Sequence, residues 1–194
     1  MSRFVFALIT AVAMAATAAA QAGTWQIDPK HSAAQFSVKH LGVSTVRGAF
    51  SKVSGTVTHD PADPSKDSLE ATIDASSVDT RVEMRDNDLK SPHFFDVQKY
   101  PTITFKAKSV KSAGAGKLSI TGDLTMHGVT KEVVLDVEGP SAPIKDPMGP
   151  GQRIGASAST KINRQDFGIA GAPGVVSDEV TITIDAELTQ AAAK

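Results

Sequence analysis

The sequence predicts an all-β fold, an eight-stranded antiparallel barrel with one short helix near an end. Three observations lead to this prediction: apolar and polar residues alternate along most of the chain, the alternating segments number about eight, and a single stretch has helical character. Alternation with a period of two is typical of antiparallel strands with one dry face and one wet face. About eight such strands are enough to close a small barrel.

Composition narrows the class of protein and its partners. The chain has 194 residues, of which 41% are hydrophobic, and this length is expected for one domain with a sizeable core. Lysine and arginine number 20 against 21 aspartate and glutamate residues, so the formal charge of −1 gives no electrostatic reason to expect nucleic acid as a partner. The chain contains no cysteine, which excludes a disulfide framework, a zinc ribbon, an iron–sulfur cluster and a thiol nucleophile.

The N-terminal segment has the three parts of a secretory signal peptide. Arg3 gives it a basic start, an uncharged apolar run follows, and the small residues Ala20 and Ala22 fit a cleavage site. A retained membrane anchor is the competing interpretation, but the second half of the run is mostly alanine and threonine, too weakly apolar for a good span. We therefore expect residues 1–22 to be removed and residues 23–194 to form one exported domain. An exported chain without cysteine must be stable by packing alone, which fits a bacterial periplasm.

Alternating segments place the expected strands along the exported domain. In each of them the apolar residues share one parity, as Ile103 and Phe105 do. The strongest alternation occupies six segments: 35–39, 68–75, 102–108, 118–126, 132–138 and 180–188. Weaker strands are expected at about 46–59 and 153–163, which brings the number to about eight.

The segments between the strands predict one helix and one long loop. Residues 81–91 predict a short helix across one end of the sheet, ended by Pro92. Residues 139–151 contain four prolines and three glycines and predict a long irregular connection. The tail 190–194 has no pattern and is expected to be frayed.

Small residues on the dry faces favour a hollow barrel. An eight-stranded barrel is close to the size at which side chains either fill the interior or leave space for one ligand. Six alanines occupy positions where a solid core would place larger side chains: Ala71, Ala75, Ala107, Ala156, Ala158 and Ala186. An apolar cavity would select an apolar ligand, because burying an unpaired polar group costs free energy. The alternative, which the sequence leaves open, is that these alanines mark places where strands or the helix pack closely.

The sequence lacks the common catalytic and metal-binding motifs. It contains no G-x-S-x-G, S-x-x-K or H-E-x-x-H motif and no glycine-rich phosphate loop. The five histidines stand singly without the spacing of a metal site, so we predict no metal, no cofactor and no catalytic residue. His40 and His127 lie beside glycines near strand ends and could converge at a barrel mouth. A surface or turn position is expected for His31, His59 and His93.

Four segments, KHLG, FFDVQKYPTITF, LTMHGVTK and INRQDFGI, occur in this order along the chain. Together with the flanking stretches WQIDPKHSAAQFSVKHLGVSTVRGAF and SDEVTITIDAEL, they resemble the YceI-like family of polyisoprenoid-binding, lipocalin-like periplasmic proteins. The combination is specific and covers essentially all of the exported domain. Two positions depart from the family pattern: Asp88 stands where the family commonly has a histidine before the leucine, and Met148 stands where an aromatic residue is common.

The resemblance implies a function as well as a fold. The expected fold is an extended eight-stranded, lipocalin-like β-barrel that holds a long isoprenoid lipid in its lumen. Family members are secreted carriers that need no cofactor and are often dimeric, with ligands such as polyprenyl phosphates or the tail of a quinone. For this chain the resemblance implies an isoprenoid lipid as ligand, a transient membrane contact, a homodimer and a periplasmic, non-enzymatic role in transport or stress response.

Candidate ligand contacts follow from the strand faces and from loop positions. The apolar residues expected to line the lumen are Phe36, Val38, Phe50, Ile73, Phe94, Phe95, Ile103, Phe105, Ile120, Leu124, Met126 and Phe167. The polar residues expected near the head group are His40, Arg47, Arg85, His127 and Arg164. Arginine would suit a phosphate through paired hydrogen bonds, and histidine would suit a quinone or amide oxygen.

Two other functions stay open at the level of sequence. A hydrolase or isomerase acting on such a lipid would need two titratable groups that converge in the pocket, and His127 with Asp166 is the best pair available. A stress-response protein without a ligand would use the barrel surface for interaction. A tightly packed interior would favour that last hypothesis.

Overall fold

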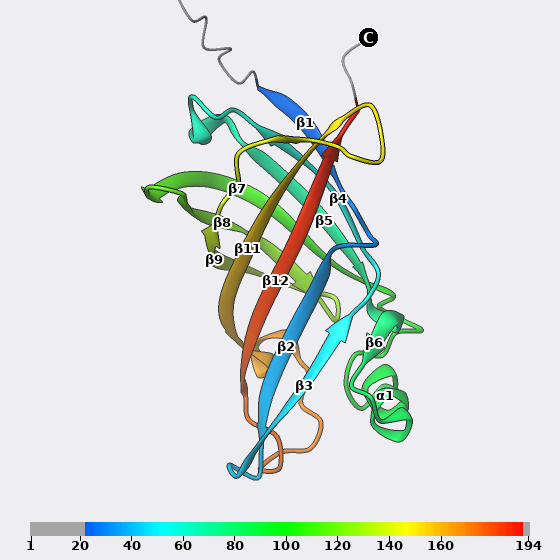
Figure 1. The fold of residues 1–194 in the computed structure, drawn as a ribbon. Coiled ribbons are helices and arrows are strands. Elements are labelled where there is room, and N and C mark those ends of the chain that lie inside the picture. Colours follow the sequence, from blue (N-terminus) through cyan, green and yellow to red (C-terminus); the bar gives the residue numbers. More distant parts are fainter. Residues whose placement is uncertain (1–21, 192–194) are drawn as a thin grey trace, which may run out of the picture.

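Eight antiparallel strands close into a barrel, as the alternation in the sequence predicts (Figure 1). The computed structural model describes residues 22–191, so all of the expected signal peptide except Ala22 lies outside the described residues. Around the barrel the strands are ordered β1, β4, β5, β7, β8, β9, β11 and β12, and β12 pairs back with β1. Their bounds are β1 Gly23–Ile27, β4 Val53–His59, β5 Ser68–Asp74, β7 Thr102–Gly114, β8 Lys117–Met126, β9 Val129–Glu138, β11 Gln152–Asn163 and β12 Glu179–Gln190. The predicted fold class is confirmed.

A hairpin extends the barrel at one end. Strands β2 (Ala33–His40) and β3 (Ser44–Phe50) pair with each other, and β2 also pairs with the part of β12 that β1 does not reach. The short strand β6 (Val78–Asp79) adds to the other edge of β3. The prediction of one strand at about 46–59 is wrong, because the chain changes partners after Phe50. Strand β3 pairs with β2 and β6, whereas β4 pairs with β1 and β5.

A bulge in β7 changes which of its residues face inward. Ala107 pairs with Gly122, yet Ser109 pairs with the adjacent residue of β8, so β7 carries one extra residue at this point. Beyond the bulge the buried side chain is Val110, at an even position, whereas the buried residues before it are at odd positions. Gly122 also makes room for Phe105, whose ring atoms lie 2.5 Å from the point where a Cβ of residue 122 would stand. Simple alternation in the sequence does not reveal this shift.

One α-helix lies beside the hairpin end of the barrel (Figure 1). Helix α1 (Glu83–Lys90) falls within the predicted range 81–91. Its buried residue is Asp86, which accepts hydrogen bonds from the backbone N–H and the hydroxyl of Thr80 at 2.8 and 2.5 Å. These bonds anchor the first turn of the helix to the chain that follows β6. No helix in the described part of the chain is long and apolar enough to cross a membrane.

The remaining connections are short turns and one long loop. Residues 22–191 include three 3-10 turns: η1 Pro64–Lys66, η2 Ala75–Ser77 and η3 Arg164–Phe167. The loop predicted at 139–151 is irregular apart from the two-residue strand β10 (Ile144–Lys145), which pairs with the start of β11. Figure 1 shows this loop at the end of the barrel opposite α1.

Candidate ligand-binding site

The barrel encloses an elongated apolar cavity of about 480 Å³. Its construction is clearest on β11 and β12, whose even-numbered residues face it: Ile154, Ala156, Ala158, Thr160 and Ile162, then Val180, Ile182, Ile184, Ala186 and Leu188. The lining part of β12 covers about 26 Å of strand. The volume falls in the range of small-molecule sites, roughly 300–1,000 Å³. The shape therefore suits a long apolar chain better than a compact molecule.

Small side chains help to keep the cavity open. Four of the six alanines predicted on dry faces line it: Ala71, Ala156, Ala158 and Ala186. The other two do not line it, because Ala75 is 1% exposed within the core and Ala107 packs against the core next to the β7 bulge. The hollow-barrel interpretation thus applies to four of these positions, and close packing accounts for the other two.

Aromatic rings form the wall near α1. The ring centroids of Phe36 and Phe50 lie 5.8 Å apart, and Phe50 meets Phe95 edge-on at 5.5 Å. Gly48 on β3 allows this arrangement, since a Cβ at this position would collide with the ring of Phe36. Edge-on and tilted contacts of this kind stabilise aromatic clusters beyond the burial of their area.

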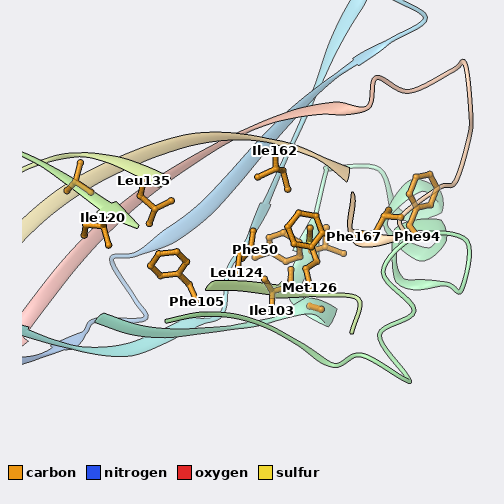
Figure 2. Close-up of a cluster of buried hydrophobic side chains, with 14 of the residues drawn as sticks. Phe50, Phe94, Ile103, Phe105, Ile120, Leu124, Met126, Leu135, Ile162 and Phe167 are labelled. Carbon is orange, nitrogen blue, oxygen red and sulfur yellow. The ribbon is translucent and has the colours of Figure 1, made fainter. Parts of the chain in front are cut away.

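Eleven of the twelve predicted lumen residues line the cavity: Phe36, Val38, Phe50, Ile73, Phe94, Phe95, Ile103, Phe105, Ile120, Leu124 and Met126. Figure 2 shows several of them as part of the buried cluster between the strands. Phe167 is the exception. It is 2% exposed and packs from η3 into the core, but it is not part of the cavity wall. Ligand contact by the wall residues stays a prediction.

Arg85 is a cavity-lining cation whose hydrogen bonds leave donors unused. Its Nε donates to the hydroxyl of Thr80 at 2.7 Å, and its Nη2 donates to the carbonyl of Thr80 at 2.8 Å. Thr80 is fixed in turn by Asp86. A guanidinium has five N–H donors, and two of them are on Nη1. Within residues 22–191 no group accepts a hydrogen bond from Nη1 of Arg85. Arg85 can therefore bind an anionic or carbonyl oxygen while Thr80 holds it in place.

Arg164 also lines the cavity, but its donors are fully used. The residue is 4% exposed, and its guanidinium binds the backbone carbonyls of four residues: Ile169, Gly171, Val176 and Ser177. The fifth donor binds the carboxylate of Asp178 at 3.1 Å. These five bonds hold the loop that connects η3 to β12. Arg164 therefore holds this loop in place and has no donor left for a head group.

The other predicted head-group residues lie apart from one another. His40 ends β2 and lines the cavity, whereas Arg47 is on the outward face of β3, where the even-numbered residues face inward. His127 is in the turn between β8 and β9, with its ring 4.6 Å from Tyr100 and its Nδ1 3.2 Å from the carbonyl of Phe167. The expected convergence of His40 and His127 at the cavity is therefore not observed, and Arg47 and His127 are not part of its wall.

A histidine expected at the surface lies in the cavity wall instead. His59 Nδ1 is 2.8 Å from Asp67 Oδ2, and the two side chains are only 15% and 7% exposed. Strand parity contains the information needed to place both residues. His59 shares the parity of Val53 and Val57 on β4, and Asp67 shares the parity of Leu69, on β5. Separate parities for β3 and β4, and an extension of the segment 68–75 by one residue, would have predicted this pair.

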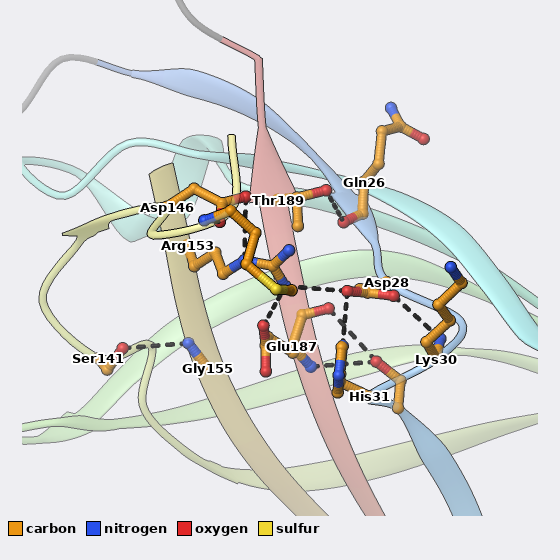
Figure 3. Close-up of polar contacts among 12 residues, drawn as sticks. Gln26, Asp28, Lys30, His31, Ser141, Asp146, Arg153, Gly155, Glu187 and Thr189 are labelled. Atoms are coloured by element: carbon orange, nitrogen blue, oxygen red, sulfur yellow. Dashed lines mark hydrogen bonds and ion pairs between the residues drawn. The ribbon is translucent and has the colours of Figure 1, made fainter. Parts of the chain in front are cut away.

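A cluster of charges ties the loop 139–151 to the barrel (Figure 3). Arg153 on β11 reaches Asp146 in the loop, Asp28 after β1 and Glu187 on β12. Its Nη1 lies 2.9 Å from Asp28 Oδ2, and its Nε lies 3.0 Å from Asp146 Oδ2. One guanidinium thus joins three separate segments at the end of the barrel opposite α1.

This cluster lowers the pKa of two carboxyl groups, those of Asp28 and Asp146. Hydrogen bonds from His31, a backbone N–H and Arg153 hold the pKa of Asp28 well below its ordinary value, and Arg153 lowers the pKa of Asp146. Donor atoms of Asp28, His31 and Glu187 lie within 4.8 Å of one another, a spacing that could suit a metal ion. Arg153 already supplies a positive charge to Asp28 and Glu187. The geometry is therefore that of a structural ion-pair cluster.

Comparison with known proteins decides the family. A family model described as a YceI-like domain matches residues 25–188. The chain belongs to the YceI-like family. A YceI protein from Salmonella arizonae is 40% identical over 176 residues, which cover 90% of this chain and 91% of the relative. A UPF0312 protein from Vibrio cholerae is 39% identical over 171 residues, covering 87% of this chain and 89% of the relative. The family resemblance of the sequence motifs is confirmed.

Solved structures share the barrel. BcnA from Burkholderia cenocepacia superposes with a TM-score of 0.72 at 27% identity, covering 83% of this chain and 98% of that protein. The YceI protein of Campylobacter jejuni gives 0.70 at 35% identity, covering 79% and 90%. A domain from Saccharophagus degradans, described as polyisoprenoid binding, gives 0.61 at 18% identity, covering 84% and 97%, which shows a common fold.

Proposed function

We propose that the protein binds one long isoprenoid lipid in the barrel and carries it through the periplasm after cleavage of its signal peptide. The observation that supports this most strongly is the elongated cavity, whose wall is built from alternate apolar residues of neighbouring strands. A related fold is described as a polyisoprenoid-binding domain in Saccharophagus degradans. A cavity of this kind also argues against a barrel that works only through its outer surface.

Apolar burial supplies the driving force for binding. Each CH₂ group moved from water into the cavity contributes about 0.8 kcal/mol before ordering costs. A polyprenyl chain offers many such groups, and the wall around Phe105, Ile120 and Leu135 leaves few polar atoms to desolvate. Tight binding therefore needs little help from the head group.

The head group is placed near α1 in this proposal. Arg85 offers its Nη1 donors there and is held by Thr80, so a phosphate or a quinone carbonyl is a suitable partner. Asp88 also lines this part of the cavity, one helical turn from Arg85. Its carboxylate opposes an anionic head group and favours a less charged one.

The lipid enters and leaves at the same end. Leu41 and Val43, at the tip of the β2–β3 hairpin, are 58% and 84% exposed, and Val175 in the neighbouring loop is 39% exposed. The backbone N–H of Leu41 donates to the carbonyl of Val175, so the two loops form one apolar tip. Val175 also lines the cavity. We propose that this tip touches the membrane surface while the ligand transfers.

The test is a titration of the purified mature protein with a polyprenyl phosphate and a long-chain quinone, followed by product analysis. The proposal predicts saturable binding of one equivalent and no chemical change. Multiple turnovers that disappear in His127→Ala or Asp166→Asn would contradict it and favour the hydrolase or isomerase. Absence of saturable binding would contradict it as well and favour a ligand-free interaction protein.

A further inference from the structure

We propose that His59 and Asp67 form a hydrogen-bonding subsite for a ligand hydroxyl, at the end of the cavity opposite α1. This inference rests on the proposed function, because it assigns a polar contact to the same cavity. It assigns to this end a ligand class whose polar terminus is an uncharged hydroxyl, such as a prenol or a quinol, bound with the hydroxyl at His59 and the tail toward α1. The contact at Arg85, which suits a phosphate, is separate from it, because Arg85 belongs to α1 and this helix lies beside the hairpin end (Figure 1).

Two fixed bonds orient the pair. Asp67 Oδ1 accepts the backbone N–H of Asp60 at 2.7 Å, and Asp67 Oδ2 lies 2.8 Å from His59 Nδ1. Because Oδ1 is occupied by the main chain, the carboxylate cannot turn without losing that bond. The pair is therefore held in one geometry in the cavity wall, with the two side chains 15% and 7% exposed.

This geometry determines what His59 can offer a ligand. An ionised carboxylate only accepts hydrogen bonds, so a neutral His59 ring must carry its proton on Nδ1. The lone pair then lies on Nε2, which has no hydrogen-bond partner within the described residues. A neutral His59 thus accepts a hydrogen bond and selects a donor. A hydroxyl group supplies one, whereas an ether or an ester does not.

Charges around the pair disfavour an anionic ligand group. Asp60, Asp63 and Asp67 all lie on the connection between β4 and β5. The ammonium group of Lys66 is 3.2 Å from Asp63 and 4.0 Å from Asp60, so it already faces carboxylates. A phosphate beside His59 would meet more negative than positive charge. An uncharged hydroxyl avoids this repulsion.

The test compares two ligands that differ only at one oxygen: a long-chain prenol and its methyl ether. Binding is measured at one fixed pH, and ¹⁵N chemical shifts of His59 report whether the ring is neutral and which nitrogen carries the proton. The wild-type protein should prefer the alcohol by about tenfold, the value of one hydrogen bond. The alcohol should also shift the Nε2 resonance on binding, and the ether should not.

Asp67→Asn is the most informative variant. The backbone N–H of Asp60 still requires an oxygen, so the amide NH₂ would face His59 and donate to Nδ1. The ring proton would then move to Nε2, where it donates to either ligand. The preference for the alcohol should fall to about parity. Glu70→Gln, on the exposed face of β5, is the control and should keep the wild-type preference.

The outcomes separate this inference from the proposed function. Equal binding of alcohol and ether by the wild-type protein would contradict the subsite but not the proposed carrier function. An unchanged preference for the alcohol in Asp67→Asn would do the same. If that variant does not fold, an Nε2 resonance that responds equally to both ligands in the wild-type protein overturns the subsite. Failure of both ligands to bind the wild-type protein would overturn the carrier and the subsite together.

Discussion

Arg85 and Arg164 both line the cavity, and their hydrogen bonds give them different roles. Arg164 uses all five donors to hold the loop between η3 and β12, whereas Arg85 donates only two hydrogen bonds, both to Thr80. Sequence alone could not separate the two arginines, because their partners, most of them backbone carbonyls, are brought near by folding. At the scale of single residues, the unused donors identify the group that can meet a ligand.

Substitutions at the α1 end test this assignment. Arg85→Gln should weaken binding of a polyprenyl phosphate by about tenfold or more, since a charge-assisted hydrogen bond is lost. Asp88→Asn should strengthen it by about threefold, a modest effect because this carboxylate is largely exposed. An uncharged quinone of similar length is the control ligand and should bind both variants much as it binds the wild type. Isothermal titration supplies the affinities, and an Arg85→Gln protein with undiminished phosphate binding would contradict the assignment.

The role of Arg164 is testable by stability rather than by affinity. Arg164→Lys keeps the charge but cannot reproduce five bonds, and we expect a loss of about 2–4 kcal/mol in the free energy of unfolding. Amides between Gly168 and Asp178 should exchange faster with solvent. Arg47→Lys, on the exposed face of β3, should change stability by less than about 0.5 kcal/mol. Equal stabilities of the two variants would rule out the loop-holding role.

At the scale of strands and loops, alternation predicted much of the barrel. The segments 102–108, 118–126 and 180–188 are strands, and the predicted helix at 81–91 contains α1. Alternation could not show the β7 bulge or the break between β3 and β4, because both depend on which strand is the partner. Nine of the eleven lumen residues found in the wall follow from the same parity, whereas Phe94 and Phe95 lie in the turn after α1. His59 was missed because one strand was expected at 46–59, whereas the inward parity changes from even on β3 to odd on β4.

The β2–β3 tip makes a prediction about transfer from membranes. Leu41 has a φ of 52°, a conformation that asparagine adopts readily, so Leu41→Asn should not destabilise the fold. Combined with Val43→Ser, it should slow lipid uptake from vesicles at least tenfold, because apolar contact with the bilayer is lost. Ile144→Ser, exposed at the opposite end, is the control. Uptake is followed with a fluorescent polyprenol, and an unchanged rate in the double variant would exclude this tip as the docking site.

The Arg153 cluster predicts how stability depends on pH. Asp28 and Asp146 have pKa values below the ordinary 3.8, so their contribution to stability is complete above that pH and is lost as the pH falls through the lowered values. Arg153→Met should lower the midpoint of thermal unfolding by about 5 °C at neutral pH. The difference from wild type should shrink in acid, where the carboxylates are protonated. Scanning calorimetry measures the two midpoints. A difference between them that does not change with pH would show that the carboxylate charges do not contribute to stability.

At the scale of the whole molecule, the barrel is hollow because small residues occupy its inner faces. Ala156, Ala158 and Ala186 lie on β11 and β12, the longest-paired strands of the ring, and each leaves the space that a larger side chain would fill. Composition and parity predicted this hollowness. They could not predict the ends of the cavity, because His59, Arg85 and Val175 come from connections whose paths depend on the folded barrel.

Native mass spectrometry of protein isolated from a bacterial periplasm tests the lipid-carrier function most directly. The wild-type protein should retain one isoprenoid lipid, and Ser159→Trp, which points outward on β11, should retain the same amount. Ala158→Trp should fill the cavity and leave the protein lipid-free but folded, since overpacking costs about 1–3 kcal/mol. A wild-type protein without bound lipid, or a folded Ala158→Trp protein with its full lipid content, would contradict the binding of an isoprenoid in the barrel.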